Sequence, residues 1–391
     1  MNLFKTLIYM YLLLRPYYFF SSGSLQISDF ALILAFFVFL LQSASNKKII
    51  INNIQKNREF LIFTLLVIII NGIYYIIYGD FTFIKSSLFF IFNFIVIILF
   101  SNLIEDSNFL VKMSKIMKLN LLIQLLICIT KIGRIYGGVR YMGTFNDPNQ
   151  FAYFVLTTYS IFFLLNYKEK NMNLLLYLLI TVFLIIQSGS TGMLLGVGVF
   201  VIFEIIAILK NIPRFFKKYL QYIIGCAYII LLLFSIYELV IFANPSVKND
   251  VKNRLSNINI VTRLNNKLVK ANKSQGNLWQ ERGYDRIYYY PKYLIFGFGE
   301  GNYSRLSLTY HHGELHATFP SILFCYGIIP FLILIKWIYK KMKKIPLGIL
   351  VIYIALFAES FTLQNERQSL FWIIVLLASL FRKEGEMVEQ N

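Results

Sequence analysis

Charged residues are scarce in this sequence: Asp, Glu, Lys and Arg make up 15% of it, against 58% hydrophobic and 17% aromatic residues. Soluble domains usually carry about 25% charged residues, so the composition excludes an ordinary soluble protein. Cysteine is scarce as well, and Cys128, Cys226 and Cys325 all fall inside apolar runs, which excludes a disulfide framework or a cysteine metal cluster. Fixed-period repeats and Pro-rich or Gly/Ser-rich linkers are also lacking. We therefore predict a single polytopic membrane domain over residues 1–391.

What the chain does have is a series of apolar runs separated by short polar stretches. A membrane-spanning helix needs roughly 20 apolar residues, and the runs predict an all-α, integral membrane helical bundle with about 12 transmembrane helices. Ten or eleven helices stay possible, because the first run contains Arg15 and Pro16 and the last is short. The predicted spans are 3–20, 27–43, 60–78, 84–104, 117–133, 150–166, 172–187, 191–209, 219–242, 316–337, 345–361 and 368–381.

The basic residues predict how the chain is oriented. One alternate set of short segments carries 21 of the 38 lysines and arginines, and such residues accumulate in cytoplasmic loops. We assign that set and both termini to the cytoplasmic side of the cell membrane. Much of the net charge of +19 is then a topology signal and a match to anionic lipid, so no nucleic-acid partner is expected. The predicted location is a multi-pass protein of the cell (plasma) membrane.

One connection is much longer than the others, the predicted extracytoplasmic loop 243–314. It carries eleven basic and five acidic residues on the side where positive charge is not expected, which suggests an anionic ligand. Apolar residues spaced by three and four between 247 and 268 predict an amphipathic helix, lying on the membrane or capping the bundle. Further along, Arg282 and Arg286 are one helical turn apart and could face a single anion. The nearby tyrosines fit either sugar stacking or an interfacial aromatic belt.

A second polar group lies in the external segment "GGVRYMGTFNDPNQFAYF" of residues 137–154. Asp147 before Pro148 predicts an N-cap and a first helical position. The positive end of that helix would face outside beside Arg140, an arrangement that suits an anion. A well-capped span with no further role fits the same residues. The turn "SGSTG" at 188–192 lies on the same side.

All three histidines stand in "HHGELH", residues 311–316. His316 is at the outer end of a predicted span, where the bundle would position it and an acceptor could reach it. An interfacial cluster without function is one alternative. A zinc site of His312, His316 and Glu314 is another, although no ligand-rich pattern accompanies it. A transporter of lipid-linked sugars is the third, but the polar residues gather on one side and we see no internal symmetry.

The order of these motifs resembles the O-antigen polymerase and ligase superfamily, closest to its polysaccharide repeat-unit polymerases. The resemblance rests on "GTFNDPNQFA" before a middle helix, then "RGYDR" and "LIFGFGEG" in a long external loop, then "ELH" leading into "LFCYGIIPF". It covers residues 137–335, and the flanking regions agree only in being spans. Many relatives carry an arginine in the turn where this chain has Thr191, which puts that phosphate contact in doubt.

The resemblance implies a membrane glycosyltransferase that moves a growing glycan from polyprenyl diphosphate onto the next lipid-linked repeat unit. It implies catalytic roles for His316, Arg282 and Arg140. A neutral histidine can accept the proton of a sugar hydroxyl, and arginines can hold a diphosphate leaving group. The expected partners are lipid-linked donor and acceptor, the bilayer, a flippase and a chain-length regulator, with no cofactor and no metal. The further expected substrate contacts are Arg286, Arg305, His312, Asn146, Asp147 and Glu314.

Overall fold

A computed structural model describes residues 3–21, 23–44, 47–137, 140–167, 172–211, 280, 282–309, 313–361 and 363–381. Contacts divide the chain into two compact units, residues 1–197 with 276–391, and residues 198–275. The predicted span 219–242 and the amphipathic pattern at 247–268 lie outside the described residues. All the site residues discussed below that the structure describes belong to the first unit.

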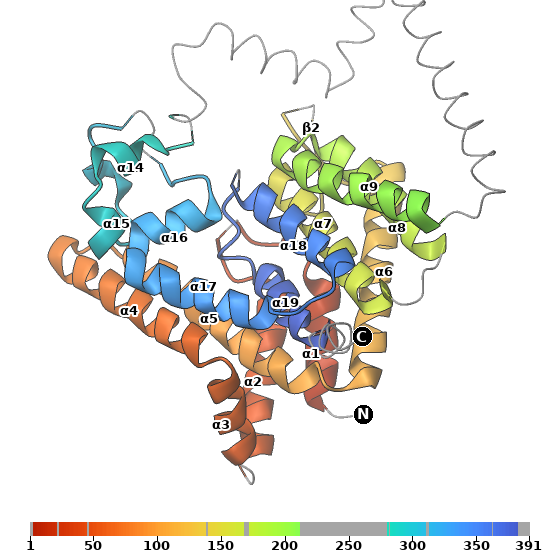
Figure 1. Cartoon of the computed structure of the whole chain (residues 1–391), viewed down its shortest axis with the longest axis horizontal. Coiled ribbons are helices and arrows are strands. Elements are labelled where there is room, and N and C mark those ends of the chain that lie inside the picture. Colours follow the sequence, from red (N-terminus) through yellow and green to blue (C-terminus); the bar gives the residue numbers. More distant parts are fainter. Residues whose placement is uncertain are drawn as a thin grey trace, which may run out of the picture. The chain divides into compact units, whose positions relative to one another are not determined.

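Among its described residues the first unit is mostly helical, as the sequence predicts (Figure 1). It also contains a two-stranded antiparallel sheet, in which Tyr136 pairs with Arg140. Its strands are β1 (Arg134–Tyr136) and β2 (Arg140–Gly143). The helices before the long loop are α1 (Leu3–Leu14), α2 (Ile27–Ser43), α3 (Lys47–Lys56), α4 (Arg58–Tyr78), α5 (Thr82–Leu103), α6 (Ser107–Ile129), α7 (Pro148–Asn166), α8 (Met172–Ser188) and α9 (Thr191–Asn211), which runs on into the second unit. Those after it are α14 (Asp285–Tyr289), α15 (Tyr293–Phe296), η2 (Tyr303–Arg305), α16 (Thr318–Tyr326), α17 (Ile328–Met342), α18 (Leu347–Ser360), α19 (Ser369–Leu377) and η3 (Ala378–Phe381).

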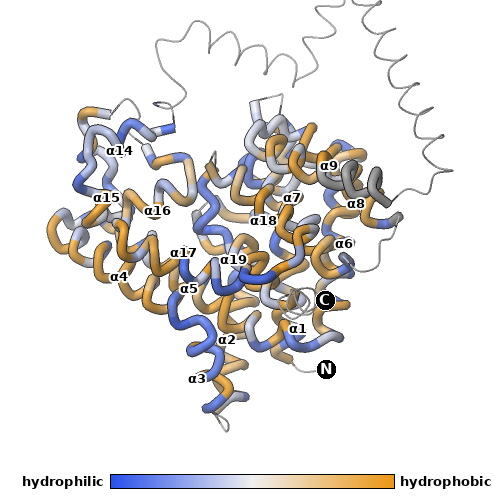
Figure 2. The backbone as a smooth tube through the Cα atoms, in the orientation of Figure 1, coloured by the Kyte–Doolittle hydropathy of each residue, from blue (hydrophilic) through white to orange (hydrophobic). Residues whose placement is uncertain are grey.

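Two described helices, α4 and α5, are long and apolar enough to cross a membrane by length and composition. Figure 2 shows α4 hydrophobic along most of its length, next to the hydrophilic α3. Most other described helices in predicted spans are shorter apolar helices, and α6 contains three lysines. The structure thus does not confirm a bundle of twelve spans.

Two predicted spans have different limits in the structure. The span 3–20 is too long, because α1 ends at Leu14. Pro16 cannot continue the amide ladder, and the buried Arg15 turns to Asp29, with 2.9 Å between guanidinium and carboxylate. The segment 47–56, predicted as part of a loop, forms α3.

The predicted span 316–337 is wrong as a single helix, because it is two helices that meet at Gly327. Gly327 has φ of +79°, and a Cβ there would lie 2.4 Å from the carbonyl oxygen of Ile295. Only glycine tolerates this combination of left-handed backbone and close contact. The break lets the "GFGEG" turn dock on α16, where the Phe298 and Gly299 amides donate to the Cys325 carbonyl at 3.0 and 2.8 Å.

The core between these helices is aromatic. Phe60 of α4 lies 4.9 Å from Trp337 of α17 and 5.0 Å from Trp372 of α19, measured between ring centroids. All three side chains are fully buried. Rings of this size bury large apolar areas and prefer such tilted and edge-on contacts. The cluster joins a helix near the start of the chain to two helices near its end.

Polar segments predicted to share the cytoplasmic side contact one another. Lys5 pairs with Asp106, Lys56 with Glu105 at 2.8 Å, and Lys340 with Glu59. We call these three ion pairs the lysine end. These segments were assigned to one side from the basic residues alone. The lysine end brings together the segments at residues 5, 56–59, 105–106 and 340.

Segments predicted to lie outside also contact one another. The Arg140 guanidinium donates to the Ser188 carbonyl at 3.0 Å, and the Asn146 amide donates to the Phe20 carbonyl at 2.6 Å. The long loop is joined to the 361–368 loop in the same way, as described below. The alternation read from the basic residues is therefore consistent with the contacts at both ends of the helices.

Candidate functional site

The turn that carries His316 is held by the "RGYDR" segment. The His316 backbone amide donates to the Arg282 carbonyl at 3.1 Å, and the Arg286 guanidinium donates to the Gly313 carbonyl. His316 itself is exposed. The structure thus brings Arg282 and Arg286 to the turn of His316, although His316 follows them by 34 and 30 positions in sequence.

The prediction that Arg282 and Arg286 lie one turn apart on the same helix is wrong. Helix α14 begins at Asp285, so Arg282 lies in the turn before it and the two side chains do not share one helical face. Gly283 explains the turn, because it has φ of +76°. Arg282 is partly exposed, whereas Arg286 is fully buried.

Arg286 contacts the His316 turn from the buried side. Its guanidinium lies 5.3 Å from the ring centre of Tyr303, in addition to its bond to Gly313. Burial lowers the pKa of Arg286, while Tyr303, Asp285 and Glu314 act in the opposite direction. A buried arginine bound to backbone positions the turn rather than meeting solvent.

An ion network that the sequence analysis missed fixes the same turn from the other side. Arg367 binds Glu300 with Nε at 2.8 Å and also with Nη2, and that Nη2 donates to Glu314 at 2.9 Å. Glu300 has only 1% of its side chain exposed and accepts a further hydrogen bond from Tyr326. We call Arg367, Glu300 and Glu314 the Arg367 network. The network links Glu314, two positions before His316, to Glu300 in the buried "GFGEG" turn.

Arg367 belongs to the loop 361–368, which connects α18 and α19. The Tyr284 hydroxyl donates to the Phe361 carbonyl at 2.6 Å, and the backbone N–H of Asn365 donates to Thr318 Oγ1 at 2.9 Å. Arg15 reaches Gln368 at 3.3 Å. The sequence signal was present, since "QNER" is a run of polar residues between two apolar helices on the predicted outer side. Such a run in a short loop is unusual unless the residues have a structural or chemical role.

Glu366, next to Arg367, is fully buried and neither carboxylate oxygen hydrogen-bonds to a described residue. Burial, and then the negative charge of Glu300, raise the pKa of Glu366 to about 8, although Arg367 opposes this. Loss of contact with water also raises the pKa of the partly buried Tyr303. Arg367 behaves differently, because Glu300 and Glu314 together outweigh its burial and raise its pKa.

Arg140 lies in a second cluster at the start of α7. The predicted cap is confirmed, since Asp147 accepts hydrogen bonds from the amides of Asn149 and Gln150 at 2.7 and 3.1 Å, with Pro148 in the first turn. Besides Ser188, Arg140 binds the side-chain oxygen of Asn149 at 2.9 Å. Both partners orient its guanidinium over the helix end.

The two clusters are connected through α7. Helix α7 packs against α19, which follows the loop of the Arg367 network. Tyr153 on α7 is buried, as are Glu359 at the end of α18 and Glu366 in the loop before α19. Helix α7, which carries the Asn149 partner of Arg140, therefore also packs against the helix that follows the loop of the Arg367 network.

The remaining predicted site residues have separate environments. Arg305 donates to the carbonyls of Phe298, Gly301 and Asn302 at 2.9 to 3.0 Å, and its guanidinium carbon lies 3.7 Å from the Phe298 ring centre. Asn146 binds Arg134 as well as Phe20. His312 lies outside the described residues. Within the described part of the chain, no three His, Cys, Asp or Glu side chains form a group that could hold a metal ion.

Comparison of this chain with known protein families, with curated proteins and with solved structures finds no match.

Proposed function

We propose that this chain is a polysaccharide repeat-unit polymerase that acts on the outer face of the cell membrane. One observation carries the proposal: segments predicted to lie outside bring His316 and Arg282 together, and the Arg367 network braces the turn between them. The multi-pass bundle with cytoplasmic termini is part of this proposal. The contacts of the lysine end support the assumed orientation.

The proposed reaction forms one glycosidic bond and breaks one bond to phosphate. The hydroxyl of the lipid-linked acceptor attacks the anomeric carbon of the donor glycan, and polyprenyl diphosphate leaves with the bonding electrons. The hydroxyl proton passes to the imidazole of His316. Attack opposite the leaving group inverts the anomeric centre. No metal and no cofactor enters this scheme.

Each side chain has a distinct proposed part. The exposed His316 accepts the proton, a role that histidine side chains commonly perform. Arg282 and Arg140 bind the diphosphate and stabilise its growing negative charge. Arg286 and the Arg367 network hold the backbone that carries His316 and Glu314. Additional substrate contacts are proposed for Arg305, His312, Asn146 and Asp147.

Reconstitution in liposomes with a lipid-linked repeat unit tests the function. A ladder of products of increasing length is the expected result. Transfer of the glycan to a different lipid or to protein would instead establish a ligase, and movement of the substrate across the bilayer without bond formation would establish a flippase. Either outcome would overturn the polymerase proposal. A flippase and a chain-length regulator are the expected protein partners.

A further inference from the structure

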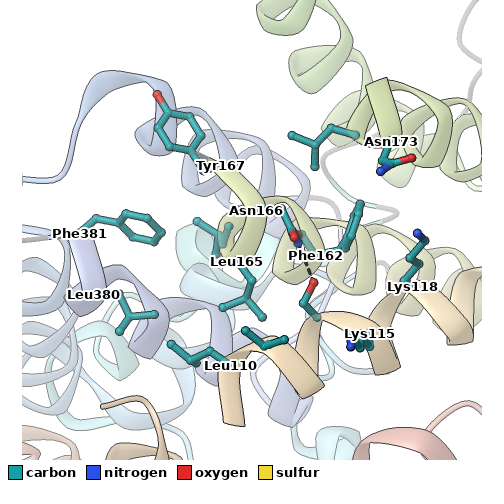
Figure 3. A pocket seen from close by; sticks show the side chains of 14 residues that line it. Leu110, Lys115, Lys118, Phe162, Leu165, Asn166, Tyr167, Asn173, Leu380 and Phe381 are labelled. Atoms are coloured by element: carbon teal, nitrogen blue, oxygen red, sulfur yellow. Dashed lines mark hydrogen bonds between the residues drawn. The ribbon is translucent and has the colours of Figure 1, made fainter. Parts of the chain in front are cut away.

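A pocket of about 560 Å³ lies among α6, α7, α8 and η3, at the C-terminal end of α7 and thus at the other end of that helix from Asn149, the partner of Arg140 (Figure 3). Ser114 of α6 and Asn166 of α7 are joined across it by a hydrogen bond of 2.7 Å. Aliphatic and aromatic side chains make most of its wall, among them Leu110, Leu165 and Phe381. The pocket thus has an apolar wall with a satisfied polar pair.

The charge of this pocket has one sign. Lys115 and Lys118, three residues apart on α6, line it, and no acidic residue does so among those the structure describes. The Lys118 ammonium lies 5.2 Å from the ring centre of Tyr177, which keeps it over α8. At the lysine end, by contrast, each of the three lysines pairs with a carboxylate. Two ammonium groups without a lining carboxylate favour an anionic ligand.

The apolar surface continues outward from the pocket. Val111 lines it and is 56% exposed, and Leu176 and Leu179 on α8 are 51% and 59% exposed. A free anion would gain nothing from this surface. An amphiphile would bury hydrocarbon on it, at about 0.8 kcal/mol for each CH₂ group removed from water.

We propose that this pocket binds an anionic phospholipid of the cytoplasmic leaflet, with its phosphate at Lys115 and Lys118 and an acyl chain along Val111 and the α8 leucines. Both lysines belong to the segments predicted to be cytoplasmic, where basic residues meet anionic headgroups. The inference rests on the proposed membrane location but not on the proposed reaction.

The test measures lipid binding to the purified full-length protein in neutral detergent by native mass spectrometry. Phosphatidylglycerol and phosphatidylcholine with identical chains are titrated against the natural sequence and against Lys115→Gln/Lys118→Gln. Each lysine should contribute about fivefold in affinity, so the double variant should bind phosphatidylglycerol about 25-fold more weakly. Lys47→Gln/Lys48→Gln on α3 removes the same charge from exposed positions outside the pocket and should leave binding unchanged.

A second variant guards against misfolding of the first. Val111→Asp puts a carboxylate one helical turn from Lys115 at an exposed position, and should weaken phosphatidylglycerol binding as well. Equal binding of both lipids, or equal loss in the α3 control, would overturn the site. Competition by inorganic phosphate at the lipid's concentration would overturn the assignment to a lipid. Binding does not require glycan transfer, so this result and that of the liposome assay are independent.

Discussion

The Arg367 network and the lysine end both consist of ion pairs, yet their surroundings differ. In the network, Glu300 is 1% exposed and Arg367 24% exposed, and each makes several hydrogen bonds. At the lysine end, Lys56 and Glu105 are 53% and 73% exposed. Taking charges out of water costs several kcal/mol per ion, whereas exposed pairs contribute about 0 to 1 kcal/mol.

Charged side chains have two different roles in this chain. Buried charges are retained where geometry must be fixed, here the turn that carries His316. In the proposed orientation the exposed lysines would lie on the cytoplasmic side near lipid headgroups, where their exact partners would matter little. Substitutions in the two regions should therefore have effects of very different size.

The largest effect is expected at His316, since the proposed reaction needs its imidazole as a base. His316→Ala should reduce ladder formation in liposomes by about 100-fold to 10,000-fold at matched protein level. His311→Ala is the matched control within the same motif and should be nearly silent, with a partial loss for His312→Ala. Full activity of the His316 variant would reduce the motif to an interfacial cluster. Lost activity on chelation that zinc restores would favour the metal interpretation.

The arginine clamp should be almost as sensitive. Arg282→Lys and Arg140→Lys keep the charge but lose the planar fork that binds a diphosphate with two parallel hydrogen bonds. We expect each to lose about 100-fold in product formation while the protein stays in the membrane. Normal activity of both lysine variants would show that the clamp is misassigned. Arg286→Lys should lose less activity and should destabilise the protein, because that side chain is buried against the Gly313 backbone.

Glu300→Gln should break the Arg367 network and thereby lower the stability of the protein. Arg367 and Tyr326 both donate hydrogen bonds to the Glu300 carboxylate. A glutamine side chain has only one acceptor oxygen, and its NH₂ group would face one of these donors. We expect a loss of about 3 kcal/mol in the free energy of unfolding, measured in detergent. Glu105→Gln, the exposed control, should change it by less than about 1 kcal/mol. Equal losses would remove the distinction between the two regions.

Much of the fold follows from apolar runs and caps. Helix α2 has the predicted limits of 27 and 43, and the Asp147 cap at α7 was read directly from the sequence. The helix break at Gly327 was not predicted from the sequence, because a single glycine is its only signal. Glycine is required there because the Ile295 carbonyl, distant in sequence, packs against the backbone of residue 327. Pattern reasoning sees periodicity along a helix but not the segment that packs on it.

The site was predictable in part for the same reason. Arg282 stood out by residue type within the long charged loop, and His316 stood out at the outer end of the predicted span that follows it. The structure joins the two residues by a backbone hydrogen bond. Glu300 lies in the motif "LIFGFGEG" and Arg367 in the polar run "QNER", but neither was given a role, because their role comes from a contact across 67 positions of sequence. For Arg367, the only signal in the sequence was the polar run "QNER" before α19.

Glu366 should make stability depend on pH. Its folded pKa is raised above that of an unfolded carboxyl, so the folded state holds a proton that the unfolded state releases. Stability is then greatest below the unfolded value of about 4.5 and falls as pH rises toward about 8. Between pH 6 and 8 we expect a loss of about 2 kcal/mol from this group. Thermal unfolding in detergent should show that loss and a flatter profile for Glu366→Gln. Parallel profiles would mean that Glu366 does not titrate in this range.

The smallest effect is expected at Lys56, and it tests the other side of the comparison. Lys56→Gln removes an exposed ion pair with Glu105, whose two side chains are held in one geometry at an entropic cost that offsets their attraction. We expect a change below about 0.5 kcal/mol in the free energy of unfolding, shrinking further at high salt because ions screen exposed charges. Ladder formation should be unchanged, since Lys56 lies at the lysine end and the proposed chemistry does not. A loss as large as that of Glu300→Gln, persisting at high salt, would mean that this pair also fixes structure and that exposure does not separate the two uses of charge.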